Sequence, residues 1–279
     1  MSLIFNTGAG EEHGGFYNGV ATQSVRGVVS KTSKMVLDGT AGDRKTWTWS
    51  CWVKRSVLGA DMKIFNAGVV GNDDIDIFFP ASDQFMISDR SGHNLKTTAV
   101  FRDTSAWYNF VVVMDTVQSG VTFVAGNTLK VYVNGVRLTA FASGTSLPDE
   151  NDSFSINHTR IHHIFTRNLN DNNFGGYLAD MNLIDGTAIG ETNGYLDEFG
   201  ELKNGVWIPK DTSGLTFGNN GFRLQFKETE LGAGDTDTIG ADTSGKNHHF
   251  TSSGIVASDC AMPDSPENNF CTLNPLELI

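Results

Sequence analysis

Paired carboxylates are the first groups in this sequence whose spacing could do chemistry. A retaining glycosidase needs two carboxylates about 5 to 5.5 Å apart, and residues two positions apart on a strand share a face. Asp74 and Asp76 meet that spacing in "NDDIDI", whereas Asp197, Glu198 and Glu201 lie in turn-rich sequence. Charge runs are usually a solvated face. We therefore expect Asp74 and Asp76 to be exposed and the chain to carry no catalytic residues.

Aromatic side chains offer a second chemistry, the binding of carbohydrate. Sugars stack their apolar C–H faces on Trp or Tyr rings and hydrogen-bond to nearby polar groups. Trp52 is notable because it stands on the otherwise polar face of "TWTWSCWVKR", residues 46–55. It is either a ligand platform or the floor beneath another segment. The candidate glycan-binding residues are Trp52, Tyr132, Tyr195 and Trp207.

Metal binding would use loop carboxylates and amides, the oxygen ligands that Ca²⁺ prefers. The residues of suitable type are Asn72, Asp73, Asp171, Asn172 and Asn173. These are also ordinary turn formers, and the sequence contains no EF-hand loop pattern. The pairs His162-His163 and His248-His249 are adjacent, so on a strand their side chains point to opposite faces and neither pair chelates one ion by itself.

Nucleophilic catalysis and phosphate binding have no sequence support. There is no G-x-S-x-G, and "GAGEEHGG" lacks the Lys and the strand-to-helix context of a phosphate loop. The three cysteines are Cys51, Cys260 and Cys271. Cys51 falls on a predicted core face, where a thiol acts as a small hydrophobe. We expect reduced cysteines, and a Cys260–Cys271 bridge is the alternative left open.

The elements that would position these groups are short strands. Runs with a side-chain period of two alternate with turn clusters, and no stretch has a convincing helical period. The pattern predicts an all-β antiparallel jelly-roll sandwich. "LKVYVNGVRLTAF", residues 129–141, predicts a hairpin, because Asn134-Gly135 tolerates positive φ at both central positions of a type I′ turn.

Two strands are predicted to lie deep in a sheet. In residues 46–55, Trp47, Trp49, Cys51 and Val53 share one face, which we interpret as a core face. In "WYNFVVVMD", residues 107–115, both faces are apolar, so this strand should be central and covered on each side. We expect an N-terminal arm over 1–30, a jelly-roll domain over 31–228 that includes a returning strand near 221–228, and a Gly-, Asp- and Ser-rich extension over 229–279.

Charge and composition narrow the functional classes. The chain has 279 residues and a formal net charge of −12, so as a whole it should repel nucleic acid and anionic lipid surfaces. The first ten residues have no basic start and no long apolar run, and nothing later approaches a membrane span. We expect a protein made in the cytoplasm without a signal peptide.

Several segments together resemble a known family. "RKTWTWSCWVKRS", "FRDTSAWYNFVVVMDT", "LKVYVNGVRLTAF" and "FGGYLADMNLIDG" are similar to the laminin-G-like jelly roll of the concanavalin A-like lectin/glucanase superfamily. The later "NGVWIPK", "GNNGFRLQFKE", "DTSGKNHHFTSSG" and "DSPENNFCTLNP" resemble the version found in tail-fibre-like virion proteins of bacteriophages. A Trp at the place of Trp52 recurs in relatives with different ligands, which favours the structural role for it.

The resemblance implies a lectin-like virion component that recognises a bacterial surface glycan. It implies a fibre, spike or decoration protein, with other virion proteins as partners and a homo-oligomeric state, a trimer if it belongs to a fibre. Relatives hold Ca²⁺ in loops at one rim, which would use Asn72, Asp73, Asp171 and Asn173. A polysaccharide-degrading hydrolase and a purely architectural virion protein are the alternatives.

Overall fold

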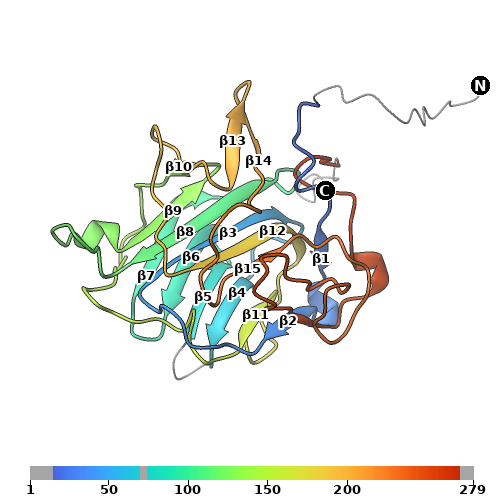
Figure 1. Cartoon of the computed structure of the whole chain (residues 1–279), viewed down its shortest axis with the longest axis horizontal. Coiled ribbons are helices and arrows are strands. Elements are labelled where there is room, and N and C mark those ends of the chain that lie inside the picture. The colour runs from blue at the N-terminus through green and yellow to red at the C-terminus, as the bar shows by residue number, and fades with distance from the viewer. Residues whose placement is uncertain (1–14, 70–73, 271–279) are drawn as a thin grey trace, which may run out of the picture.

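The computed structural model describes residues 15–69 and 74–270. It contains two seven-stranded sheets and one separate hairpin, and every pairing between its strands is antiparallel (Figure 1). The first sheet has the order β1–β12–β3–β8–β9–β10, with β15 also on β12, and the second has the order β16–β2–β11–β4–β5–β6–β7. The expected all-β jelly-roll sandwich is confirmed.

The structure has strands in the stretches predicted over 46–55, 107–115 and 129–141, and it adds β1, β13, β14 and β16, which the sequence pattern did not predict. The first sheet comprises β1 (Val25–Gly27), β3 (Thr46–Arg55), β8 (Tyr108–Asp115), β9 (Leu129–Val133), β10 (Val136–Arg137), β12 (Gly176–Asp185) and β15 (Phe222–Leu224). The second comprises β2 (Lys34–Leu37), β4 (Met62–Gly68), β5 (Asp74–Phe79), β6 (Gln84–Asp89), β7 (Asn94–Val100), β11 (His162–Ile164) and β16 (Thr251–Ser253). The hairpin is β13 (Gly200–Lys203) with β14 (Val206–Pro209), and the short helices are η1 (Val29–Lys31), η2 (Ala125–Asn127) and η3 (Ala257–Asp259).

The main core lies between the two sheets. The predicted core face of β3 is confirmed, because Trp47, Trp49, Cys51 and Val53 are all fully buried in it. These side chains meet residues of the second sheet such as Phe65, whose ring centroid lies 6.2 Å from that of Trp49. The alternation of the sequence therefore sets which face of β3 looks inward.

The first sheet is covered on its outer face as well. β8 lies between β3 and β9, with Phe110, Val112 and Met114 in the main core. On its other face, Val111 and Val113 pack with side chains from the segment between β12 and β15, namely Leu196, Phe199 and Phe217. The prediction of a central strand covered on both sides is confirmed.

The predicted Asn-Gly hairpin is also present. Asn134 has φ 50° and Gly135 has φ 76°, and Val133 pairs with Val136 across the turn. Positive φ at both central residues is the signature of a type I′ turn, whose twist matches that of the strands.

The two ends of the described chain are tied to the sandwich and to each other. β1 and β16 each add a strand to a sheet, and Phe250 and Ile255 are part of the main core. Glu267 accepts hydrogen bonds from the backbone N–H groups of Gly19, Val20 and Ala21. Residues 229–270 thus share the core of the domain.

Within the described part of the chain, no helix is both long and apolar enough to cross a membrane. Cys51 and Cys260 are free and buried, and burial raises the pKa of the Cys260 thiol to about 11. Cys271 lies outside the described residues, so the alternative of a bridge to Cys260 falls there too.

Candidate functional site

Trp52 is the floor under another part of the chain. Its side chain is 3% exposed and packs with Trp107 and Ala179, and Trp207 and Tyr177 pack against this group. Lys54, on the same face of β3, is fully buried and donates to Asp264 at 2.8 Å. A ring enclosed in this way has no free face for a sugar, so Trp52 serves packing.

Tyr132 has no free face either. It is 1% exposed among the apolar side chains on the outer face of the first sheet. Its hydroxyl donates to Oε1 of Glu191 at 2.8 Å, and burial, followed by this hydrogen bond, raises the pKa of Tyr132. Tyr132 is a core residue in this structure, with its polar tip satisfied.

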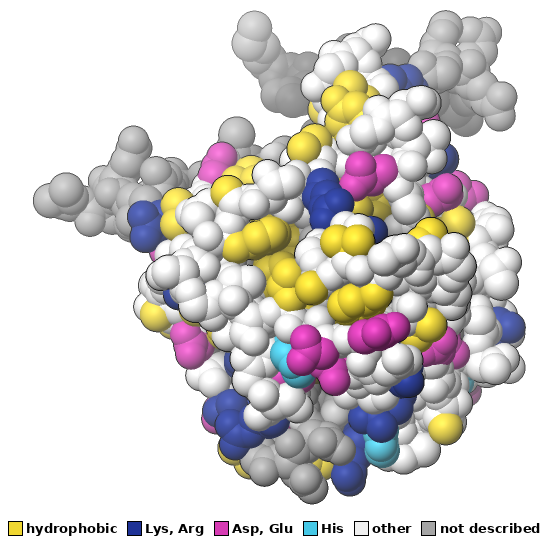
Figure 2. Space-filling model, turned by 90° about the vertical axis from the view of Figure 1, so that its left-hand side faces the viewer, with side chains coloured by type: hydrophobic (Ala, Val, Ile, Leu, Met, Phe, Trp, Pro, Cys, Tyr) yellow, Lys and Arg dark blue, Asp and Glu magenta, His cyan; other side chains and the backbone are white. Residues whose placement is uncertain are grey.

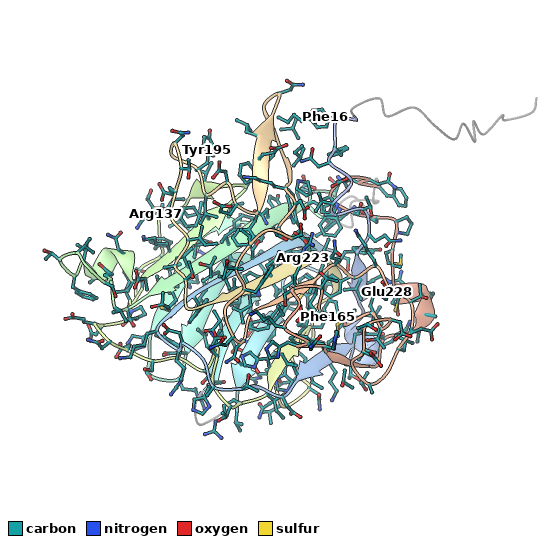
Figure 3. All side chains as sticks on the ribbon, viewed as in Figure 1. Phe16, Arg137, Phe165, Tyr195, Arg223 and Glu228 are labelled. Atoms are coloured by element: carbon teal, nitrogen blue, oxygen red, sulfur yellow. The ribbon has the colours of Figure 1, made fainter. Side chains whose placement is uncertain are left out.

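Tyr195 and Trp207 lie together. Their ring centroids are 6.2 Å apart with an interplanar angle of 21°, and Tyr195 is 36% exposed. The indole ring of Trp207 packs directly against the backbone of Gly135 and Gly200, and this slot exists because neither residue has a side chain. A Cβ would lie 2.3 Å from the ring at Gly135 and 2.5 Å from it at Gly200. Figure 3 shows Tyr195 near the upper rim of the molecule. Tyr195 is thus the candidate with an accessible ring, and Trp207 supports it.

The slot around Trp207 makes a testable prediction. Gly200→Ala should displace the indole and destabilise the domain by about 1–3 kcal/mol, the usual effect of overpacking a filled site. Gly190→Ala is the matched control, because a Cβ there would meet nothing within 4 Å. Urea denaturation of both variants measures the effect, and equal stability of the two would contradict the role assigned to the slot.

The metal candidates are not brought together as a cluster in the described residues. Asn72 and Asp73 lie outside those residues. Both carboxylate oxygens of Asp171 accept hydrogen bonds from Arg167, and the Asn173 amide donates to the carbonyl of Asn170. Among residues 15–69 and 74–270 no group of three or more His, Cys, Asp or Glu side chains could hold a metal ion. Asp171 is therefore an ion-pair partner here.

The carboxylates of β5 are buried, so the expectation of a solvated face was wrong. Asp74 and Asp76 are each 7% exposed. Asp76 accepts hydrogen bonds from Lys63 at 2.7 Å and from Asn66 at 2.9 Å, and Asp74 lies 3.7 Å from Arg90. Burial raises the pKa of Asp74, with the charge of Asp76 as the second cause. The neighbouring cations explain how these acids tolerate burial.

A polar pocket of about 380 Å³ lies where β15 meets the N-terminal segment. Its lining residues are Asn18, Gly19, Val20, Asp211, Ser213, Arg223, Gln225 and Lys227. In Figure 3, Arg223 is seen over the middle of the sheets. An open pocket of this size, lined by charged and amide side chains, has room for a sugar residue and can hydrogen-bond to its hydroxyl groups.

One lining residue of this pocket, Arg223, lies among buried and partly buried charges. Arg223 is 5% exposed and donates from Nη2 to Asp211 at 2.9 Å. Its Nε lies 3.8 Å from Oδ1 of Asp180, which is 1% exposed, and neither atom has a hydrogen-bond partner among the described residues. Burial raises the pKa of Asp180 to about 6, against the lowering effect of Arg223.

The backbone at Asp180 is irregular. Its φ is 41°, in the left-handed region, at a register shift between Ala179 and Asn182 in the pairing of β12 with β3. Such bulges re-aim a side chain, and unusual backbone conformations gather at functional sites. Asn182, where regular pairing with β3 resumes after the bulge, accepts a hydrogen bond from the Thr212 hydroxyl. This bond holds the segment that carries Asp211 against the sheet.

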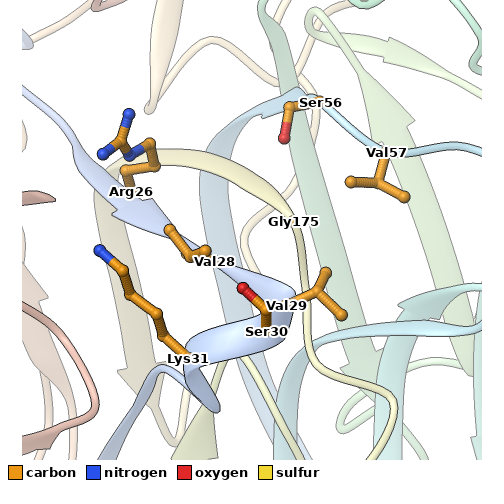
Figure 4. A pocket seen from close by; sticks show the side chains of 9 residues that line it. Arg26, Val28, Val29, Ser30, Lys31, Ser56, Val57 and Gly175 are labelled. Atoms are coloured by element: carbon orange, nitrogen blue, oxygen red, sulfur yellow. The ribbon is translucent and has the colours of Figure 1, made fainter.

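Two other surfaces fit a ligand less well. A wider cavity of about 620 Å³ beside η1 is mainly apolar, with Val29 and Val57 flanking Gly175 (Figure 4). Its cations, Arg26 and Lys31, are both paired with Asp259. Figure 2 shows a band of hydrophobic side chains on one face, and patches of this kind are common on monomers.

Comparison with known families places the fold. A family model described as concanavalin A-like lectin/glucanases superfamily matches residues 30–191, more than half of the chain. The chain belongs to this superfamily. No curated protein matches it.

Solved structures share the fold of this superfamily domain at low identity. A candidate carbohydrate binding protein from Bacteroides ovatus ATCC 8483 aligns with a TM-score of 0.53 and 15% identity, over 85% of this chain and 59% of that one. A heptameric SAP-like pentraxin from Limulus polyphemus gives 0.42 and 12%, over 62% and 80% of the two chains. Tailspike protein 2 of Escherichia coli O157:H7 bacteriophage CAB120 gives 0.38 and 13%, over 61% and 24%. These likenesses concern the fold alone.

The polar pocket of this concanavalin A-like domain was not predicted from the sequence. All its lining residues lie outside the matched range 30–191. The signal was present in "FRLQFK", where Phe222 and Leu224 enter the core while Arg223, Gln225 and Lys227 alternate outward. Two cations on one face of a strand in an acidic chain could have marked the site, but its other wall comes from residues 18–20, about two hundred positions away.

Proposed function

We propose that this chain is a non-enzymatic virion component of a bacteriophage that attaches to a bacterial surface glycan through the polar pocket at β15. The observation that carries the proposal is that pocket: a concavity of about 380 Å³, lined by Asn, Asp, Ser, Arg, Gln and Lys, on a lectin-like fold. Planar amides, carboxylates and guanidinium groups are the side chains that bind sugar hydroxyls.

The pocket walls are held in place before any ligand arrives. Glu267 fixes the backbone of residues 19–21, and Asn18 donates to the carbonyl of Pro209 at 2.9 Å and to Glu201 at 3.0 Å. A preformed site avoids much of the entropic cost of ordering on binding. Tyr195 supplies an additional accessible ring for stacking elsewhere on the domain.

The phage context is supported by sequence. Segments that resemble tail-fibre-like virion proteins, "NGVWIPK" and "GNNGFRLQFKE", run into or carry pocket residues. In a virion, several copies would engage a repetitive polysaccharide together, so a weak single contact becomes a strong attachment. We expect a homo-oligomer for that reason.

Binding of the purified chain to a panel of extracted bacterial surface polysaccharides tests the proposal, with sugar release followed in the same tubes. We expect binding without release. Release of sugar would overturn the non-enzymatic assignment. Single alanine variants of Asp74, Asp76, Glu198 and Glu201 would then identify the catalytic carboxylate. If the chain neither binds glycan nor releases sugar, with host cells as well as with extracted polysaccharides, glycan attachment is overturned and an architectural role remains.

A further inference from the structure

We propose that the pocket at β15 selects a sugar residue that bears a carboxylate, and that Lys227 is the residue that reads its charge. This inference rests on the proposed function and adds the chemical class of the ligand. The starting point is the charge of the lining, which has two cations, Arg223 and Lys227, and one acid, Asp211, in a chain of net charge −12.

The two cations differ in whether a carboxylate of the described residues pairs with them. Arg223 is committed to Asp211 through Nη2, and the Asp211 carboxylate also accepts from Ser213 N–H at 2.9 Å and from its hydroxyl at 2.8 Å. No carboxylate among the described residues forms an ion pair with Lys227. Of the two cations in this pocket, Lys227 is therefore the one without a carboxylate partner in residues 15–69 and 74–270, and it has N–H groups to offer an anionic ligand.

The cations also converge on one point. In the orientation that satisfies its amide, the oxygen of Gln225 accepts from Nη2 of Arg223 and from Nζ of Lys227, each at 3.2 Å. Both N–H groups of Nη2 are then used, one on Asp211 and one on Gln225, whereas the ammonium of Lys227 has three N–H groups, of which the described residues accept one. Lys227 is therefore the donor placed to reach a ligand oxygen beside Gln225. Hydrogen bonds to a charged acceptor are about twice as strong as neutral ones, so a carboxylate gains more here than a hydroxyl.

Asp180 beneath the pocket adds a pH dependence. Its carboxyl accepts a hydrogen bond from Asn182 and lies 3.8 Å from Nε of Arg223, and its charge also interacts with Lys227, Asp211 and the Cys51 thiol. Because the pKa of Asp180 is about 6, lowering the pH from 7.5 to 5.5 protonates most of this carboxyl and leaves the cations less compensated. A sugar carboxylate, with a pKa near 3.5, stays ionised over this range. Its affinity should rise roughly threefold.

The test uses one polymer in two forms, so that only charge differs. An oligomer of galacturonic acid and its carboxyl-reduced counterpart, which is neutral, are titrated into the full chain by calorimetry at pH 7.5 and 5.5. We expect the acidic form to bind at least tenfold more tightly. Lys227→Met keeps the aliphatic stem and should abolish that preference, since it removes the charge-assisted hydrogen bond to the sugar carboxylate. Lys96→Met, on β7 of the other sheet, is the matched control.

The outcomes separate the two proposals. Equal binding of the acidic and reduced oligomers, or an unchanged preference in Lys227→Met, overturns the inference and leaves glycan binding in place. If neither oligomer binds while a neutral surface polysaccharide does, the inference is again overturned alone. If no glycan of any kind binds, the proposed function and the inference fall together.

Discussion

Replacing Asp264 with Ala should destabilise the domain by about 3–5 kcal/mol, because it leaves the Lys54 ammonium buried without a counter-ion. Lys54 is fully buried and donates to both carboxylate oxygens of Asp264, at 3.1 and 2.8 Å. Its remaining partners are Asn269 and the carbonyl of Phe270, each at 2.8 Å. Asp264 also accepts from Nε1 of Trp107 at 3.1 Å. The loss should appear as a lower urea midpoint with an unchanged slope.

A double variant distinguishes charge from packing. Lys54→Met with Asp264→Leu removes both charges and keeps apolar volume, and such replacements of buried pairs are often neutral. We expect it to recover most of the stability that Asp264→Ala loses. If Asp264→Ala unfolds at the same urea concentration as the unaltered chain, the C-terminal segment is not held by this ion pair.

This ion pair also shows where sequence reasoning reached its limit. The alternation in 46–55 correctly predicted the core face of β3, because period and burial are both local properties. It also raised the question of what covers Trp52 on the other face, where Lys54 lies as well. The answer, Trp207 and Asp264, comes from segments more than one hundred and fifty residues away. No local pattern in Gly- and Asp-rich sequence specifies such a partner.

The carboxylates of β5 illustrate the same limit in a different way. Asp74 and Asp76 were correctly placed on one face of a strand, but their burial depends on neighbours from other strands. Lys63 and Asn66 come from β4 and Arg90 follows β6. A charged face was interpreted as solvated because the sequence shows the charges without the strand order that pairs them.

Replacing Asp180 with Asn should stabilise the protein at neutral pH by about 1–3 kcal/mol. Burial raises the pKa of this carboxyl to about 6 from its ordinary 3.8. The folded state therefore holds the Asp180 proton more tightly than the unfolded state does. That contribution to stability is fully present below pH 3.8 and is lost as the pH rises through 6. Two pKa units correspond to roughly 3 kcal/mol, the upper limit of the gain.

Asn suits this position for a local reason as well. Asp180 has φ 41°, and Asn tolerates the left-handed region as readily as Asp does. Its amide oxygen can keep the hydrogen bond from Nδ2 of Asn182, which is 3.3 Å from the present carboxylate. Urea denaturation at pH 5 and 7.5 should show a flatter pH dependence for the variant. A less stable variant at pH 7.5 would mean that the Arg223 contact outweighs the cost of burying the charge.

Asp211→Asn is the opposite control in the same pocket. Hydrogen bonds from Ser213 lower the pKa of Asp211, so its ionised form is favoured in the folded protein and its loss should slightly reduce stability. Asp180, in contrast, lowers stability at neutral pH. Residues in binding sites commonly reduce stability in exchange for function. If Asp180 tunes the charge beneath Lys227, Asp180→Asn at pH 7.5 should bind the acidic oligomer as tightly as the unaltered chain does at pH 5.5. The stabilising substitution would then remove this pH dependence of binding and flatten that of folding.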